Sequence, residues 1–85
     1  MKITLNNSYK NDLVNLIGDK ELFILENELI NYILLEIKED IKELLSFSII
    51  NNFYINYKVV NNNNSLIIDI KDIENEKLNY NVLVF

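Results

Sequence analysis

The spacing of apolar residues changes once along this 85-residue chain, and that change limits the folds it can adopt. From Asn27 to Leu45 apolar residues recur every three or four positions, the period of a helix that buries one face. From Phe53 onward they recur at every second position, the period of a strand. The chain therefore predicts a small α+β domain in which helices from the first half pack on a sheet from the second. The length fits one hydrophobic core, so we expect residues 1–85 to form a single domain.

The strongest helical signal is one stripe of eight apolar residues: Leu29, Ile30, Ile33, Leu34, Ile37, Ile41, Leu44 and Leu45. It predicts one long amphipathic, acidic helix of roughly 28 Å. Before it, Ser8 is placed to cap a short helix, and Gly18 supplies the positive φ that commonly follows a helix end. Glu26 interrupts the apolar stripe. Residues 20–25 are therefore either a helical turn set at an angle or a short buried strand.

Alternation predicts the strands. Residues 2–5 read as a short N-terminal strand, and three later segments alternate in the same way: 53–60, 66–71 and 78–85. A polar turn at Asn61–Asn64 would place Val59 opposite Leu66, and a second turn would span residues 72–77. A further strand at 46–50 competes with a continuation of the helix. We expect a three- to four-stranded antiparallel sheet packed on the helices.

Missing residue types exclude several chemistries. The chain has no histidine or cysteine, so a histidine base, a cysteine nucleophile and a thiolate zinc site are ruled out. It begins without the apolar run of a signal peptide, and charged and amide side chains interrupt its longest apolar region, Leu22 to Ile37. We therefore expect a cytoplasmic, non-enzymatic protein with no catalytic residues, cofactor, metal site or membrane span.

One short motif bears on metal-dependent catalysis. Asp69, Ile70 and Lys71 resemble the second half of a metal-dependent nuclease signature, in which an acid, any residue and a lysine end a strand. That signature also needs an acid on the preceding strand, where this chain has Asn56 and no carboxylate. We interpret Asp69 and Lys71 as a solvated charge pair.

The net charge of −5 resides in residues 19–45, which hold eight acids and three lysines, while the rest of the chain has five of each. On the expected helix, acids gather on one flank beside a tyrosine. Carboxylates one helical turn apart are about 5–6 Å from each other, near the spacing of successive phosphates. A divalent cation site on the later acids and an ordinary solvated face are the alternatives. The candidate partner-binding residues are Glu28, Tyr32, Glu36, Glu39, Asp40 and Glu43.

These features suggest two functions. Direct nucleic-acid binding is disfavoured, because the chain has no arginine and a pI near 4.5. The chain is small and acidic, lacks catalytic groups, and has the amino-acid composition expected from a coding sequence rich in the bases A and T. In these respects it is similar to small phage and mobile-element proteins that act against CRISPR effectors or restriction enzymes. The likeness implies an inhibitor that binds the basic surface of a nucleic-acid-binding effector. The alternative is an assembly module that homodimerises through its last strand, where Leu83 and Phe85 share a face.

Overall fold

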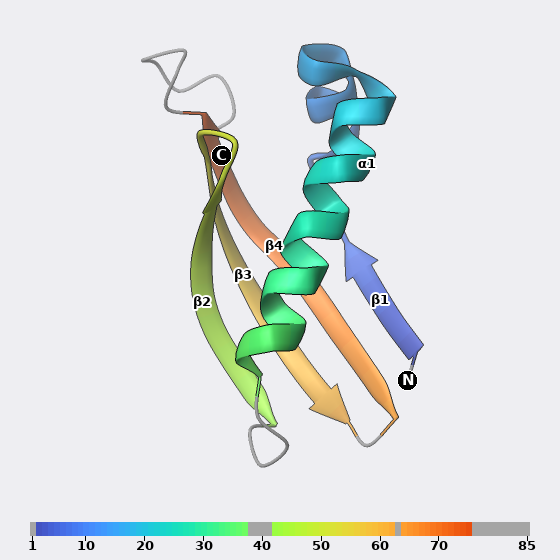
Figure 1. The fold of residues 1–85 in the computed structure, drawn as a ribbon, viewed down its shortest axis with the longest axis vertical. Coiled ribbons are helices and arrows are strands. Elements are labelled where there is room, and N and C mark those ends of the chain that lie inside the picture. Colours follow the sequence, from blue (N-terminus) through green and yellow to red (C-terminus); the bar gives the residue numbers. More distant parts are fainter. Residues whose placement is uncertain (1, 38–41, 63, 76–85) are drawn as a thin grey trace.

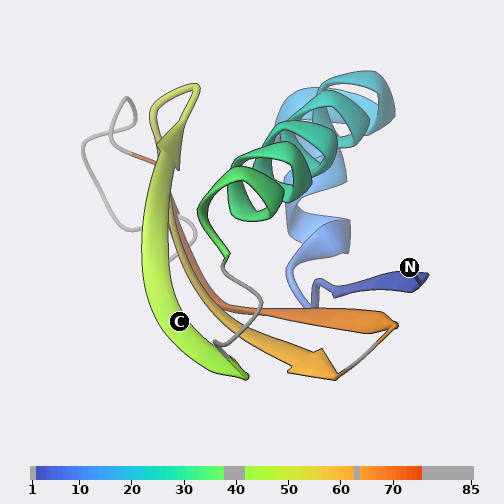
Figure 2. The same cartoon turned by 60° about the horizontal axis from the view of Figure 1, so that its bottom comes forward.

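One helix lies across one face of a four-stranded sheet (Figures 1 and 2). The computed structural model describes residues 2–37, 42–62 and 64–75. In chain order its elements are β1 (Lys2–Asn6), α1 (Lys10–Glu36), β2 (Glu43–Ile50), β3 (Phe53–Asn62) and β4 (Ser65–Asn75). The strands lie in the order β1-β4-β3-β2, so β1 and β2 form the two edges. The chain thus has the α+β fold that its change of period predicts.

The sheet is mixed, which corrects the expectation of a fully antiparallel sheet. β1 runs parallel to β4, whereas the β2–β3 and β3–β4 pairs are antiparallel. The reason is the number of times that the chain changes direction between β1 and β4. α1 carries the chain back across the sheet, and the two hairpins that follow reverse it twice more, so β4 runs in the same direction as β1. Leu5 then lies opposite Ile68, which brings the apolar face of β1 to the core side.

The boundaries of the long helix differ from those expected. α1 begins at Lys10 and ends at Glu36, and Ile37 already has extended backbone, so the prediction of a helix reaching Leu45 is wrong. Residues 43–50 instead pair along their full length with β3. The apolar residues of this segment fit the period of a helix as well as that of a strand. It forms a strand because it pairs with β3. The strand considered at 46–50 is confirmed, with a start three residues earlier.

The start of α1 also corrects two expectations. Ser8 does not cap the helix: the N-cap residue is Tyr9, whose backbone N–H donates to Asn7 Oδ1 at 3.0 Å. Glu26 does not interrupt the helix, because it lies half-buried and accepts a hydrogen bond of 3.3 Å from Asn7 Nδ2. Gly18 does have the predicted positive φ, at +87° with ψ at 163°. It breaks the helical backbone inside α1, so the predicted short first helix is the segment of α1 that precedes it.

Two tight turns set the register of the hairpins. Asn51 and Asn52 join β2 to β3 with φ of 49° and 69°, the left-handed conformations that a two-residue hairpin turn requires and that asparagine tolerates. In the next hairpin Val59 pairs with Ile68, so the predicted pairing with Leu66 is wrong by two residues. The turn is shorter than the four asparagines suggested. A shift of two preserves the face of every side chain, so the apolar pattern could not exclude it.

β4 runs farther than its alternation suggested. It continues to Asn75, so the turn expected at 72–77 is wrong for residues 72–75, and the strand expected at 78–85 lies outside the described residues. Lys71 is an extra residue in β4, because Tyr57 pairs with Ile70 while the preceding residue of β3 pairs with Asp72. The Tyr9 hydroxyl donates to the Lys71 carbonyl at 2.6 Å, so a hydrogen bond joins this irregular position of β4 to the N-cap residue of α1.

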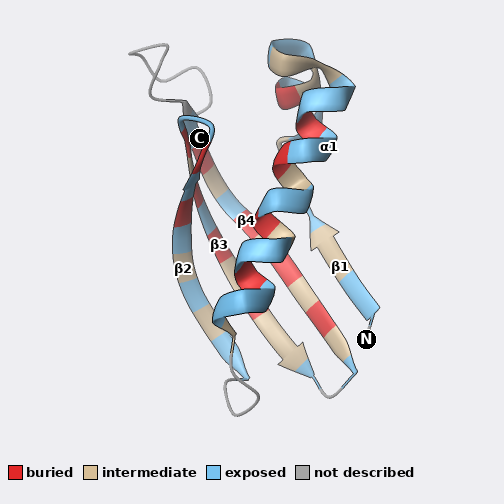
Figure 3. Cartoon of the chain, in the orientation of Figure 1, coloured by how far each residue is buried: buried red, intermediate tan, exposed pale blue. Residues whose placement is uncertain are grey.

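The core lies between α1 and the inner face of the sheet, as the buried segments in Figure 3 show. Its members come from α1 and from all strands except β1, which contributes the partly buried Leu5. The core residues are Leu13, Leu22, Leu25, Leu29, Ile33, Ile50, Phe53, Ile55, Tyr57, Val59, Leu66, Ile68, Ile70 and Ile73. No helix in the described part of the chain is both long enough and apolar enough to cross a membrane.

Candidate functional site

Part of the predicted acidic surface is present on α1. Glu28, Tyr32 and Glu36 are exposed and stand four residues apart, which places them on successive turns along one flank of the helix. The buried residues Leu25, Leu29 and Ile33 keep that flank in place, because they hold the adjacent side of α1 against the sheet. We call the surface formed by Glu28, Tyr32 and Glu36 the acidic flank.

Of the other predicted members, the structure describes only Glu43, which lies on a strand and not on α1. Glu39 and Asp40 lie outside the described residues. Glu43 opens β2, where its Oε1 lies 3.0 Å from Lys58 Nζ, so its charge already has a partner. The helical spacing that would have aligned Glu43 with Glu36 is absent, because α1 ends before it. Three of the six predicted residues therefore share one surface.

Electrostatics within the acidic flank couple its tyrosine to its last acid. The hydrogen bond between the Tyr32 hydroxyl and the Glu36 carboxylate, together with the negative charge of that carboxylate, raises the pKa of Tyr32 above its ordinary value of 10.0. The contact thus favours the protonated form of the Tyr32 phenol. The flank presents carboxylate oxygens and one aromatic ring, a combination suited to a basic and partly apolar partner.

Within the described residues, no ion pair involves a member of the acidic flank. Among residues 2–37, 42–62 and 64–75, the ion pair found is that of Lys58 with Glu43, on another part of the surface. The same described residues contain no group of three or more potential ligands arranged to hold a metal ion. Glu36 and Glu43, the first and last members of the cation site considered on Glu36, Glu39, Asp40 and Glu43, lie on α1 and β2 and so do not share a helix.

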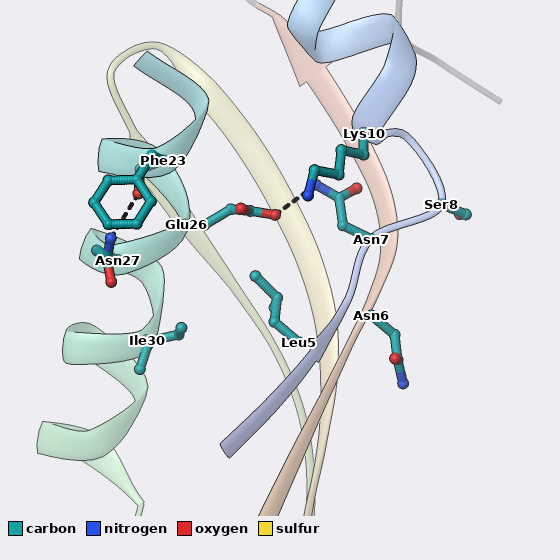
Figure 4. A pocket seen from close by; sticks show the side chains of 9 residues that line it. All are labelled: Leu5, Asn6, Asn7, Ser8, Lys10, Phe23, Glu26, Asn27 and Ile30. Atoms are coloured by element: carbon teal, nitrogen blue, oxygen red, sulfur yellow. Dashed lines mark hydrogen bonds between the residues drawn. The ribbon is translucent and has the colours of Figure 1, made fainter. Parts of the chain in front are cut away.

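A separate groove lies on the opposite flank of α1, where the helix faces the end of β1 (Figure 4). It encloses about 580 Å³, with Leu5, Phe23 and Ile30 as its apolar walls. Its polar lining consists of Asn6, Asn7, Ser8, Lys10, Glu26 and Asn27. The spacing of residues in the chain gave no sign of it, because the lining comes from β1, the β1–α1 connection and the middle of α1.

Asp69 and Lys71, the two charged residues of the nuclease-like motif, have different surroundings in β4. Asp69 Oδ1 accepts a hydrogen bond of 2.6 Å from Asn6 Nδ2 on the neighbouring strand, while Lys71 occupies the irregular position of β4. Asp69 is thus fixed by an amide across the β1–β4 pair, which is a structural role.

Sequence reasoning missed an exposed apolar row on β2. Leu45, Phe47 and Ile49 are 71%, 58% and 57% exposed, although they belong to a regular strand. They alternate with residues that face the core, and Figure 3 shows this alternation along β2. Residues 43–50 do show the period of two that is typical of a strand. The prediction missed it because Leu44 and Leu45 also fit the apolar stripe of the expected helix.

Comparisons with protein-family models, with curated proteins and with solved structures find no match for this chain. Its function therefore has to be argued from its own surfaces.

Proposed function

We propose that this protein acts by binding another protein, and that the acidic flank of α1 is its contact surface. The observation that carries the proposal is the placement of Glu28, Tyr32 and Glu36 on successive turns of one exposed helix flank. A basic surface that binds nucleic acid is the complementary partner, because it offers cations at the spacing of phosphates. By occupying that surface, the protein would inhibit its partner. A nucleic-acid-binding effector of host defence in the cytoplasm is the class of partner that we propose.

The charge distribution supports this choice over direct nucleic-acid binding. The chain carries a net charge of −5 with no arginine, and two glutamates of the acidic flank add to that charge where the partner would dock. Long-range attraction to a basic protein speeds encounter and weakens as salt screens it. An enzymatic function has no comparable support, because the chain has no histidine or cysteine and its nuclease-like motif lacks a carboxylate on the preceding strand.

Affinity capture tests the proposal. Tagged protein is incubated with lysate of its natural host, and the retained protein is challenged with double-stranded DNA or RNA. We expect a basic nucleic-acid-binding protein to be retained and then released by nucleic acid. Retention that nucleic acid does not affect would contradict the proposed mode of binding.

A matched pair of variants locates the surface. Glu28→Lys with Glu36→Lys raises the net charge from −5 to −1, because each reversal adds two charges, and we expect it to abolish capture. Asp12→Lys with Glu74→Lys makes the same change at exposed positions elsewhere, and capture should persist. Equal loss in both variants would show that overall charge, and not the acidic flank, determines binding.

A further inference from the structure

The outer edge of β2 offers backbone groups to another strand. β2 is the last strand in the order β1-β4-β3-β2, and within the described part of the chain its hydrogen-bonded strand neighbour is β3. A regular edge strand presents a row of N–H and C=O groups that can pair with a further strand. β2 pairs with β3 without any shift of register, so no bulge interrupts the row of backbone groups along its outer edge.

The side chains of β2 lack the features that commonly protect an edge. Proteins block such edges with lysine, proline or a bulge. β2 has none of these, and its single charged residue, Glu43, is paired with Lys58. Leu45, Phe47 and Ile49 instead project from the face of the sheet that α1 does not cover.

The neighbouring strand shows that this row suits an edge partner better than a second sheet packed on the whole face. Phe47 lies opposite Asn56, whose Nδ2 donates to Asp72 Oδ1 at 2.8 Å, and Leu45 lies opposite Lys58. A sheet packed on this face would bury Asn56 and Lys58. A strand added beside β2 would place its own side chains against the apolar row from one side and leave those polar groups in water.

We propose that β2 pairs with β2 of a second copy, antiparallel and with the two-fold axis at Phe47. The sequence of β2 is self-complementary in this register, because Phe47 meets its own counterpart and Leu45 meets Ile49 of the other copy. On the opposite face Ser46 meets Ser48. Cross-strand pairs of apolar with apolar and hydroxyl with hydroxyl side chains are the stabilising combinations.

Neighbouring registers are poorer. An axis at Ser46 would place Glu43 opposite Ile49, and an axis at Ser48 would place Leu45 opposite Asn51. Each sets a polar residue against an apolar one. Charge also favours a second copy over a basic partner at this edge, because the charge of Glu43 is compensated by Lys58 and no other carboxylate projects from β2. Two copies can therefore approach here although each carries −5.

The size of the contact predicts a weak dimer. An eight-residue strand is roughly 27 Å long and a sheet roughly 10 Å thick, so the edge offers roughly 270 Å² per copy. Stable interfaces usually bury about 1,200 Å² or more in total. Association should therefore be visible only as protein concentration rises, with backbone hydrogen bonds and the apolar row supplying the attraction.

Sedimentation equilibrium of the full chain tests the proposal at about 10 to 500 μM protein, in low and high salt. We expect a monomer–dimer equilibrium that 0.5 M salt leaves intact or strengthens, because apolar and backbone contacts are not screened. Phe47→Lys should raise the dimer dissociation constant at least about tenfold, since two lysines would face each other at the axis. Leu35→Lys, at an exposed apolar residue of α1, should leave it unchanged.

Cysteine variants test the register, and the chain has no cysteine of its own. Opposed residues of an antiparallel pair have Cα atoms about 4.5–5.5 Å apart, within the range of a disulfide. Phe47→Cys should therefore oxidise to a covalent dimer. Leu45→Cys and Ile49→Cys should each form no covalent dimer alone and should crosslink to each other when mixed.

Three results would overturn the proposal: a wild-type monomer at the highest concentration, a dimer that Leu35→Lys weakens as much as Phe47→Lys does, or equal self-crosslinking of all three cysteine variants. The proposal is independent of the acidic flank. The variant with Glu28→Lys and Glu36→Lys should dimerise normally even where it has lost its protein partner, so failure of either proposal is recognised separately.

Discussion

The Ser48 and Tyr57 hydroxyl oxygens lie 3.2 Å apart in the core, one on β2 and one on β3. Ser48 is the one buried polar residue among the described positions, and Tyr57 is almost completely buried beside it. Either hydroxyl can donate. The pair ties the edge strand to its neighbour from the inside, at a depth where an unpaired hydroxyl would lose its contact with water.

Removal of the Tyr57 hydroxyl should therefore destabilise the protein. We expect Tyr57→Phe to lower the free energy of unfolding by about 1–2 kcal/mol, because Ser48 is left buried without a partner. The double variant Tyr57→Phe, Ser48→Ala should lose less than the sum of the two single changes. Urea unfolding measures all three variants, and strictly additive losses would show that the two hydroxyls do not interact.

Gly18 should resist replacement although there is space around it. A Cβ at this position would meet nothing within 4 Å, but φ of +87° with ψ of 163° is a conformation that essentially only glycine adopts. We expect Gly18→Ala to cost about 1–3 kcal/mol. Asparagine should not rescue it, because asparagine favours the left-handed helical region, where ψ is far lower.

The sign of this change is diagnostic. In a continuous helix, Gly→Ala stabilises by about 1 kcal/mol. Thermal unfolding of Gly18→Ala, with Asn15→Ala as an exposed helical control, therefore distinguishes a broken helix from an unbroken one. A higher melting temperature for Gly18→Ala would contradict the break.

The Tyr32–Glu36 contact predicts a selective change in titration. Glu36→Gln should lower the pKa of Tyr32 toward 10.0, because the negative charge beside the phenol is removed. Glu28→Gln, one turn earlier on the same flank, should leave it unchanged. Ultraviolet titration of each protein, with the corresponding Tyr32→Phe variant subtracted, isolates this tyrosine from the other four.

The same contact sets a direction for stability against pH. Because the pKa of Tyr32 is raised in the folded chain, the contribution of the contact is fully present below pH 10.0 and is lost as the pH rises through the folded-state pKa. A Tyr32 pKa that is indifferent to Glu36→Gln would remove the evidence that these two residues act together.

The orientation of α1 is tested by two leucines. Leu29 is 1% exposed and Leu35 is 87% exposed. Leu29→Ala should cost about 2–5 kcal/mol through lost burial and the cavity it leaves. Leu35→Ala should change stability by less than about 0.5 kcal/mol. Chemical denaturation of the two variants would contradict the packing of α1 if their order were reversed.

The sequence predicted the elements better than it predicted their ends. Alternation in residues 53–60 correctly placed Phe53, Ile55, Tyr57 and Val59 on the buried face, and the single glycine correctly predicted a positive φ. Burial of alternate residues is a local property, so a local pattern can show it.

The end of α1 could not be read in the same way. Leu44 and Leu45 extend the helical stripe, yet they belong to β2, where one packs against the core and the other is exposed. The choice depends on pairing with β3, a contact between residues distant in the chain. The turn at Asn51 and Asn52 was a usable signal for that hairpin, but asparagine is so frequent here that its runs carried little weight.

The wrong end predicted for the helix also affected the candidate site. Glu28, Tyr32 and Glu36 share a flank because they lie within the helix as it exists, whereas Glu43 was assigned to that flank only by extending the helix into β2. The exposed row on β2 was missed for the same reason. Once residues 43–50 are a strand, Phe47 and its neighbours become a surface.

The most direct test of the central claim is the salt dependence of binding between this protein and the partner captured from its host. We expect affinity to fall steeply as salt rises from about 50 to 300 mM, since screening weakens attraction between charged surfaces. The variant with Glu28→Lys and Glu36→Lys should bind at least about tenfold more weakly at low salt and show a shallower slope. Unchanged affinity and slope in that variant would show that the acidic flank is not the contact surface.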